Sequence, residues 1–299
     1  MKQILKSCTA LIAALSLAAV LAACRRAPQP TTTATAKPPA TTAAETTTQA
    51  PSQDNESDLL VYDFLSDAEK EVYNRLVEAI EGSEAYMEED VAEFSAKIVD
   101  RVYFYYLLPD RPDLFYVRGN SNLYEYTGTG EELARFDIQY IYNGVQYDER
   151  MQKIESIARQ IRQSLPENAD DFAKAKAIYD YLIENCDYDY DYTGNSQQEA
   201  QTNASYADGA LVDGKAVCSG YSRAFKLLAN KLGIACMCVS NSDHEWNIVR
   251  IGGDYYHIDV TWADTEDNPG ERYFCVTDEE IYKDREKPRI AVPECVVVR

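Results

Sequence analysis

A stretch with almost no large apolar side chain, residues 25–58, is the feature that most constrains how this chain folds. The stretch is rich in Thr, Ala and Pro, so it cannot bury enough surface to offset the entropy that ordering would cost. Its prolines favour extended conformations. We therefore interpret residues 24–58 as a tether and expect globular structure from about Leu59 onwards.

The segment before the tether has the pattern of an export signal. Two early lysines precede an apolar, small-residue-rich stretch, residues 10–23, which is too short to span a membrane comfortably. The sequence Leu-Ala-Ala-Cys that ends at Cys24 resembles the lipobox of bacterial lipoproteins, whose cysteine is lipidated and becomes the first mature residue. The resemblance implies a signal peptide over residues 1–23 and an exported protein, lipid-anchored at the extracytoplasmic face of the cell membrane. The alternative is an ordinary secretory signal that happens to contain a cysteine.

The acidic composition argues against one class of partner. The 299 residues include 29 Lys and Arg against 50 Asp and Glu, which gives a net charge of −21. A protein that binds the phosphate backbone needs clustered positive charge, and the sequence has no basic patch. We therefore expect no nucleic-acid partner.

The pattern of residues 59–147 predicts a small α+β region. Ser66 followed by Glu69 is a capping-box signature for the start of a helix. Three strand-like runs follow: 114–117, 123–126 and 136–142. Asn143-Gly144 is interpreted as a turn, and the run 98–108 fits either a strand or a helix. By itself this region says nothing about chemistry.

Residues 148–299 are expected to form a second domain, and its first chemical feature is Cys218. Helices are predicted at 148–164 and 170–184. Cys218 lies at the amino end of a third, amphipathic helix, which is expected to stop at Gly233. Backbone N–H groups at a helix amino end favour the thiolate, which is the nucleophilic form of cysteine, and can stabilise an oxyanion.

The chain has two histidines, and His244 is the one that we expect to act as a base. It opens a strand that leads to Gly252-Gly253, which predicts a two-residue hairpin turn. With that turn, Asp259 on the return strand 254–262 lies on the same face as His244, at a diagonal position within reach. A three-residue turn would reverse the parity and break the arrangement. His257 shares the face of Asp259 and is interpreted as structural.

Three short motifs, in the order Cys, His, Asp, carry a family resemblance. They are Cys218-Ser219-Gly220-Tyr221, His244-Glu245-Trp246-Asn247 and Asp259-Val260-Thr261-Trp262. These motifs closely resemble those of the bacterial transglutaminase-like domain, and the resemblance extends over about residues 148–281. It implies a papain-like α+β fold in which a nucleophile helix packs on an antiparallel sheet. It also implies Cys218 as the nucleophile, His244 as the base and Asp259 as the acid that orients the base.

The resemblance also implies something about the surroundings of the site. Residues 111–116 look like the accessory region that precedes this domain in many exported members. Tyr206, Trp246 and Trp262 are expected to lie beside the site. His257 falls at a position that is structural in the family pattern.

The remaining cysteines do not predict a disulfide framework. With Cys8 in the signal peptide, Cys24 lipidated and Cys218 free, five cysteines remain, which is an odd number. We expect Cys236 and Cys238 to lie on opposite faces of a strand, as core residues that are poor disulfide partners and poor joint metal ligands. The state of three more is left open: Cys186, Cys275 and Cys295. We expect no metal or other cofactor, since a zinc hydrolase would need three ligands around an open site.

Together these features predict a thiol-dependent acyl-transfer enzyme. Cys218 attacks an amide carbonyl and forms a thioester, while His244 protonates the leaving amine. Water as acceptor gives a cysteine peptidase or deamidase, which we favour, and an amine gives a transglutaminase. The expected substrate is a protein or peptide at the cell surface, with cell-wall peptide as one candidate. The alternative is a catalytically silent transglutaminase-like binding module of the cell envelope, because a fold can outlive its activity.

Overall fold

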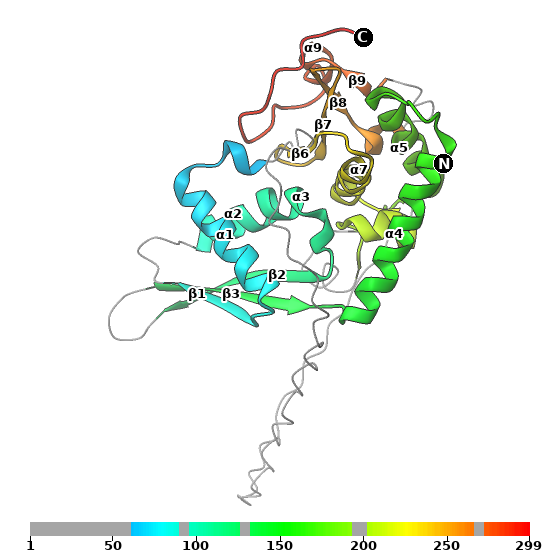
Figure 1. Cartoon of the computed structure of the whole chain (residues 1–299). Helices are drawn as coiled ribbons and strands as arrows, with labels where there is room; N and C mark the ends of the chain where they lie inside the picture. Colours follow the sequence, from blue (N-terminus) through cyan, green and yellow to red (C-terminus); the bar gives the residue numbers. More distant parts are fainter. Residues whose placement is uncertain (1–60, 90–95, 126–131, 193–201, 266–271) are drawn as a thin grey trace, which may run out of the picture. The chain divides into compact units, whose positions relative to one another are not determined.

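The computed structural model describes residues 61–89, 96–125, 132–192, 202–265 and 272–299, which belong to one compact unit, Ser52–Arg299 (Figure 1). The predicted signal peptide 1–23, the lipid-attachment residue Cys24 and the tether 24–58 lie outside the described residues. The unit combines helices with antiparallel sheets and is of the α+β class. Within the described ranges, we find no helix with the length and apolar character that crossing a membrane requires.

The amino-terminal part of the unit is a three-stranded antiparallel sheet with helical segments against it. The strands are β1 (Tyr86–Glu89), β2 (Val117–Glu125) and β3 (Glu132–Tyr140), in the order β1-β3-β2. The helical segments are η1 (Val61–Phe64), α1 (Asp67–Glu81), α2 (Ala96–Val102), η2 (Tyr103–Leu107), α3 (Leu108–Asp110) and η3 (Pro112–Leu114). Helix α1 begins as predicted, because Ser66 and Glu69 cap each other's backbone N–H groups. The ambiguous run 98–108 is helical, with its buried side chains at helical spacing.

Two local predictions for this region are wrong. The run 114–117 is mostly not a strand, because η3 occupies its start and β2 begins only at Val117. Asn143-Gly144 is not a turn but the start of helix α4 (Gly144–Ser164). The Asn143 side chain accepts from the Gln146 N–H at 3.0 Å, and the Gln146 side chain accepts from the Asn143 N–H at 3.1 Å. This reciprocal cap satisfies two N–H groups of the first turn, which is why the helix starts earlier than its apolar pattern suggests.

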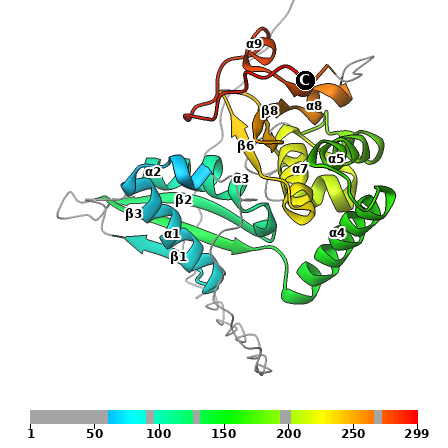
Figure 2. The same ribbon diagram turned by 45° about the horizontal axis from the view of Figure 1, so that its top comes forward.

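The second part of the unit is built around helix α7 (Cys218–Leu232). Its other helices are α4, α5 (Asp171–Asn185), η4 (Gly209–Asp213), α8 (Val260–Thr265) and α9 (Asp278–Ile281). Its strands are β4 (Asp187–Tyr188) and β5 (Lys215–Ala216), which pair in parallel, and β6 (Cys236–Ser240), β7 (Glu245–Ile251), β8 (Asp254–Ile258) and β9 (Phe274–Val276). The last four form an antiparallel sheet in the order β6-β7-β8-β9. Helix α7 is buried on almost every side and packs against this sheet and against α4 and α5 (Figure 2).

The hairpin register on which the site depends is confirmed. Ile251 pairs with Asp254 across Gly252 and Gly253, and both glycines have positive φ angles, 63° and 98°, that a two-residue turn of this kind requires. The return strand is shorter than predicted, because β8 ends at Ile258 and the chain then enters α8. Asp259 therefore sits at the junction between strand and helix, just beyond the last pair of the ladder.

The prediction for Cys236 and Cys238 is half wrong. Both are core residues, as expected, and both thiols are free. They do not lie on opposite faces of β6, however, because residues two apart in a strand point to the same side. The Nδ2 atom of Asn247 lies 3.7 Å from one sulfur and 3.5 Å from the other.

Candidate active site

Cys218 is the first residue of α7, and the backbone around it is closely packed. Val217 precedes it in an extended conformation as the cap residue, and the Cys218 side chain is half-buried. Gly220, in the first turn, lets the segment at Ala204 approach the helix. A Cβ atom at position 220 would lie 2.2 Å from the Ala204 carbonyl oxygen and 2.8 Å from the Ala216 Cβ. The glycine in the Cys-Ser-Gly motif is therefore explained by this close contact, which fixes where the helix begins.

His244 and Asp259 form a buried pair. His244 Nε2 lies 2.8 Å from Asp259 Oδ2, and their side chains are 8% and 0% exposed. The loop before His244 is held by Asn241, whose Oδ1 accepts from the His244 N–H at 2.9 Å. The other oxygen of Asp259, Oδ1, accepts from the Trp262 N–H at 3.1 Å at the start of α8. The carboxylate is thus fixed by a helix start and presents its second oxygen to the imidazole.

The electrostatics of this pair favour charges on both partners. Burial opposes the imidazolium, but the charge and hydrogen bond of Asp259, with a further hydrogen bond to Cys218, raise the pKa of His244 to about 9. Burial likewise opposes the carboxylate, but His244 and Arg285 outweigh it and hold the pKa of Asp259 below its ordinary value. Because Nε2 is engaged by Asp259, Nδ1 is the nitrogen left for Cys218. The arrangement can hold a proton on His244 at neutral pH and deliver it beside the thiol.

The residues that follow His244 tie its strand to the helix that carries Cys218. Arg223 of α7 pairs with Glu245, with two nitrogen–oxygen distances of 3.3 Å. Asn247 Nδ2 donates to the Ser222 carbonyl at 3.0 Å, and the Ser222 hydroxyl donates to the Trp246 carbonyl at 3.1 Å. These links between α7 and β7 explain why the motif continues as Glu-Trp-Asn. They set the position of the thiol relative to the imidazole.

The second histidine supports the first through Trp246. The Trp246 indole lies 5.8 Å from the His244 ring in a stacked arrangement, and its Nε1–H donates to His257 Nδ1 at 3.0 Å. His257 Nε2 lies 2.8 Å from Asp278 Oδ1. An indole N–H can only donate, so His257 Nδ1 must be the acceptor and Nε2 must carry the hydrogen. His257 is therefore the middle of a hydrogen-bonded chain, as its structural interpretation predicted.

This tautomer also bears on a cluster of potential metal ligands. His257, Asp278 and Cys295 bring one ligand-type atom each within 4.8 Å of one another. Since one ring nitrogen of His257 accepts from Trp246 and the other carries a hydrogen, the imidazole offers no lone pair to a metal. In this arrangement the cluster fits a hydrogen-bonded chain rather than a metal centre.

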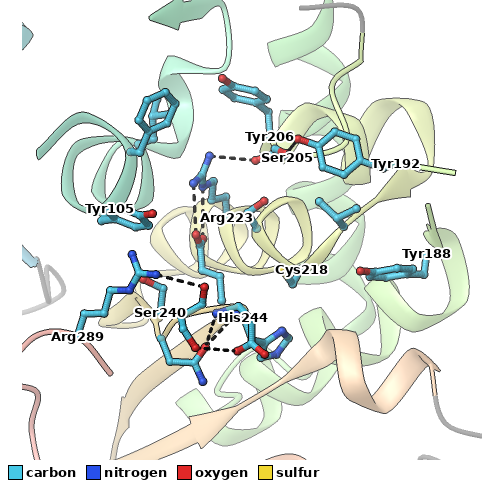
Figure 3. A pocket seen from close by; sticks show the side chains of 18 residues that line it. Tyr105, Tyr188, Tyr192, Ser205, Tyr206, Cys218, Arg223, Ser240, His244 and Arg289 are labelled. Carbon is cyan, nitrogen blue, oxygen red and sulfur yellow. Dashed lines mark hydrogen bonds and ion pairs between the residues drawn. The ribbon is translucent and has the colours of Figure 1, made fainter. Parts of the chain in front are cut away.

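Cys218 and His244 line one cleft of about 540 Å³, and both parts of the unit contribute to it (Figure 3). Figure 3 shows Tyr105 on one side and Tyr188 and Tyr192 on the other. Tyr105 belongs to η2 of the amino-terminal part, whereas Tyr188 ends β4 and Tyr192 lies just beyond that strand. The cleft is open to solvent, and both aromatic and polar side chains line it.

The structure gathers the residues that the sequence singled out. Tyr206 lines the cleft, and the Trp262 ring lies 5.4 Å from the His244 ring. Sequence reasoning missed Arg285, which forms an ion pair with Asp259, and Tyr105 in the cleft wall. Neither had a signal that could have identified it, because both meet the site through long-range contacts from segments without a motif.

Comparison with known proteins points to one superfamily. The model of the transglutaminase-like superfamily matches residues 155–264. Two solved structures are similar in part. One, named "TGase", is 14% identical, with 56% of this chain and 50% of that chain covered and a TM-score of 0.35. The other, named "putative protease" from Parabacteroides distasonis ATCC 8503, is 9% identical, with coverages of 48% and 41% and a TM-score of 0.27.

This chain thus spans half or less of the length of either structure. No curated protein sequence matches it with significance. The matched stretch contains Cys218, His244 and Asp259, and it includes α7 and the strands β6, β7 and β8. Residues 155–264 therefore match the transglutaminase-like superfamily, and the structure has an α+β fold in which the helix bearing Cys218 packs on an antiparallel sheet.

Proposed function

We propose that this chain is a thiol-dependent acyl-transfer enzyme that acts on amide bonds through a thioester at Cys218. One observation above all supports the proposal. The His244–Asp259 pair, joined at 2.8 Å and almost fully buried, lies in the same cleft as a half-buried thiol at the start of a helix. Shifted pKa values beside a half-buried thiol are typical of catalytic sites, and a silent binding module does not need them.

In the proposed reaction, His244 acts as an acid while the thioester forms and as a base while it breaks down. The Cys218 thiolate attacks the amide carbonyl carbon and forms a C–S bond, and backbone N–H groups at the start of α7 stabilise the oxyanion. The C–N bond then breaks, and the amine leaves with the proton that His244 held. His244 next removes a proton from the incoming acceptor, which forms a bond to the acyl carbon as the C–S bond breaks, and the Cys218 thiolate and the His244 imidazolium are restored. Asp259 keeps the imidazole in one orientation and tautomer throughout.

The acceptor and the substrate are further parts of the proposal. We favour water as acceptor, which makes the protein a cysteine peptidase or deamidase, since the cleft is open to solvent. An amine acceptor would make it a transglutaminase. A protein or peptide fits the aromatic walls, and cell-wall peptide is the candidate that an exported enzyme would meet first.

We also propose that the protein is exported and lipid-anchored through Cys24 at the extracytoplasmic face of the membrane. The support is the sequence pattern of residues 1–24 and the tether that follows it. Mass analysis of the amino-terminal peptide should find diacylglycerol on Cys24 and residues 1–23 removed. Cys24→Ala should shift the protein from the membrane fraction to the soluble fraction; an unmodified Cys24 in wild-type protein would contradict the anchor.

The first test of the activity is the reactivity of Cys218. The full-length chain is treated with iodoacetamide between pH 5 and 9, and the labelled cysteines are mapped by mass spectrometry. Preferential labelling of Cys218 well below pH 8, lost in His244→Ala, supports an activated nucleophile. Cys275, the other half-buried thiol within the described ranges, is the matched internal control. Equal labelling of both thiols at every pH would instead support the binding module.

The second test captures the thioester and reads the acceptor. Candidate peptides are added with and without a biotinylated primary amine, and the reaction is quenched in acid. We expect an acyl adduct on Cys218 and, without added amine, a free carboxylate in the product. Cys218→Ala and His244→Ala should abolish turnover, and Asp259→Ala should reduce it by roughly 10³–10⁴-fold. Folded variants that retain turnover would remove these residues from the mechanism.

A further inference from the structure

Arg285 lies against the His244–Asp259 pair although it comes from the carboxyl-terminal segment, beyond the family match that ends at residue 264. Its side chain is 2% exposed, and its Nη1 forms an ion pair with Asp259 Oδ2. The same oxygen accepts from His244 Nε2 at 2.8 Å. The two cations therefore share one carboxylate oxygen.

Two indoles hold the guanidinium in place. Its carbon lies 3.9 Å from the centre of the Trp262 ring and 5.0 Å from that of the Trp246 ring, so aromatic faces replace part of its hydration. The Nη2 atom is buried and makes no hydrogen bond within the described part of the chain. The guanidinium therefore does not satisfy all of its N–H donors. Its strongest partner is the buried carboxylate of Asp259.

The other charges around the cluster are accounted for. The titratable groups that face it are Cys218, Glu245, His257, Tyr273, Tyr282 and Asp284. Glu245 is paired with Arg223, and His257 stays neutral because burial lowers its pKa. Asp284 lies 3.4 Å from Arg285 Nε, but its side chain is 26% exposed, so solvent screens its charge.

The net charge of Cys218, His244 and Asp259 differs according to whether Arg285 is counted with them. In the resting state of the proposed mechanism, the Cys218 thiolate and the His244 imidazolium cancel, and Asp259 and Arg285 cancel. After the amine has left with the His244 proton, the thioester and the imidazole are both neutral, and Asp259 and Arg285 still cancel. Without Arg285 the cluster would carry one uncompensated negative charge in both states, and releasing the His244 proton would leave Asp259 as a lone buried anion.

We propose that Arg285 is a positioning residue, which shares the Asp259 oxygen with His244 so that the carboxylate stays ionised while the imidazole gives up its proton. The inference rests on the proposed acyl transfer for its purpose, but its test needs no turnover. The residue acts through Asp259 and does not contact the thiol or the substrate.

The test is the titration of His244 in the full-length chain. The chain has two histidines, so selective ¹³C labelling of histidine gives two imidazole signals, which a His257→Gln sample assigns. The series is recorded in a Cys218→Ser background, so that the thiol does not couple to the titration. Arg285→Gln should raise the His244 midpoint by on the order of one to two pH units, because a cation a few ångströms away has been removed. Lys287→Gln removes one positive charge two residues away and should leave the midpoint unchanged.

Arg285→Lys separates charge from shape. It keeps the cation and should stay within a few tenths of a unit of the wild-type midpoint. An unchanged or lowered midpoint in folded Arg285→Gln would overturn the proposal. If Arg285→Gln fails to fold, the guanidinium signals of Arg285 in the Cys218→Ser chain should still shift with the His244 midpoint, and their independence would overturn it as well. The result of this titration is independent of the activity test. An unreactive Cys218 would refute the proposed enzyme without moving the His244 midpoint.

Discussion

Replacing His244 by Gln should remove a contribution to stability that depends on pH in a defined direction. Gln keeps a donor near the position of Nε2 but cannot carry the charge. The pKa of His244 is raised from 6.5 to about 9 by the Asp259 charge and hydrogen bond acting against burial, and this rise corresponds to about 3 kcal/mol. A raised pKa stabilises the folded chain fully below pH 6.5, and the stabilisation is lost as pH rises through about 9.

The assay is urea unfolding followed by far-UV circular dichroism at pH 6, 7, 8, 9 and 10, for wild type and His244→Gln. Far-UV dichroism is preferred to fluorescence, since both tryptophans lie beside His244 and would report its protonation directly. The difference in unfolding free energy should be about 3 kcal/mol larger at pH 6 than at pH 10. A difference that is constant or that grows with pH would refute the charged His244–Asp259 pair.

His257→Gln provides a control of opposite sign. Burial lowers the pKa of His257, so its contribution is present above pH 6.5 and is lost as pH falls through the folded-state value. The difference between wild type and His257→Gln should therefore shrink on acidification, over the range where that for His244→Gln is fully developed. The same slope for both variants would mean that the two histidines are not distinguished by their surroundings.

Three further predictions test the packing around the site. Gly220→Ala should lower unfolding free energy by about 1–3 kcal/mol or more, measured by urea unfolding, because its Cβ would lie 2.2 Å from a carbonyl oxygen; unchanged stability would contradict the close contact. Trp246→Phe leaves His257 Nδ1 without its donor and should lower the unfolding free energy by about 1–3 kcal/mol in the same assay. Unchanged stability would contradict the hydrogen bond from Trp246 to His257. Burial raises the pKa of Asp110 to about 6, against opposing effects of Lys226 and two backbone N–H groups. As the pH rises from 4 to 6, wild type should therefore lose thermal stability relative to Asp110→Asn. Melting temperatures of the two proteins that change in parallel with pH would refute this.

The parts of the site that follow from local rules were predictable from the sequence. The position of Cys218 at a helix start follows from the amphipathic pattern, and the approach of Asp259 to His244 follows from the parity of a two-residue turn. The motif residues after His244 could be recognised but not explained, because Glu245 and Asn247 find their partners on α7. Their pairing depends on how a helix packs on a sheet, which no periodicity encodes.

The failures have physical causes of the same kind. The start of α4 was missed because the Asn143 cap was taken for a turn, and the two interpretations share the same residue types. Asp259 was placed inside a strand, whereas it directly precedes α8, and its Oδ1 accepts a hydrogen bond from the Trp262 N–H in the first turn of that helix. Arg285 was invisible because it comes from a segment with little regular secondary structure and meets Asp259 across 26 positions of sequence.

The cleft extends the functional unit beyond the matched domain. Tyr105 of η2 lines it, and Arg289, whose guanidinium lies 4.2 Å from the Tyr105 ring centre, joins that wall to the carboxyl-terminal segment. Arg118 of β2 lies 3.4 Å from the ring centre of Tyr206, which lines the same cleft, and donates to Asn203 Oδ1 at 2.9 Å. Substrate side chains would therefore contact residues on both sides of the predicted boundary at residue 147. Selectivity should respond to changes in η2, because Tyr105 lines the cleft, whereas the reactivity of Cys218 should depend on α7 and the sheet, which hold the thiol and His244.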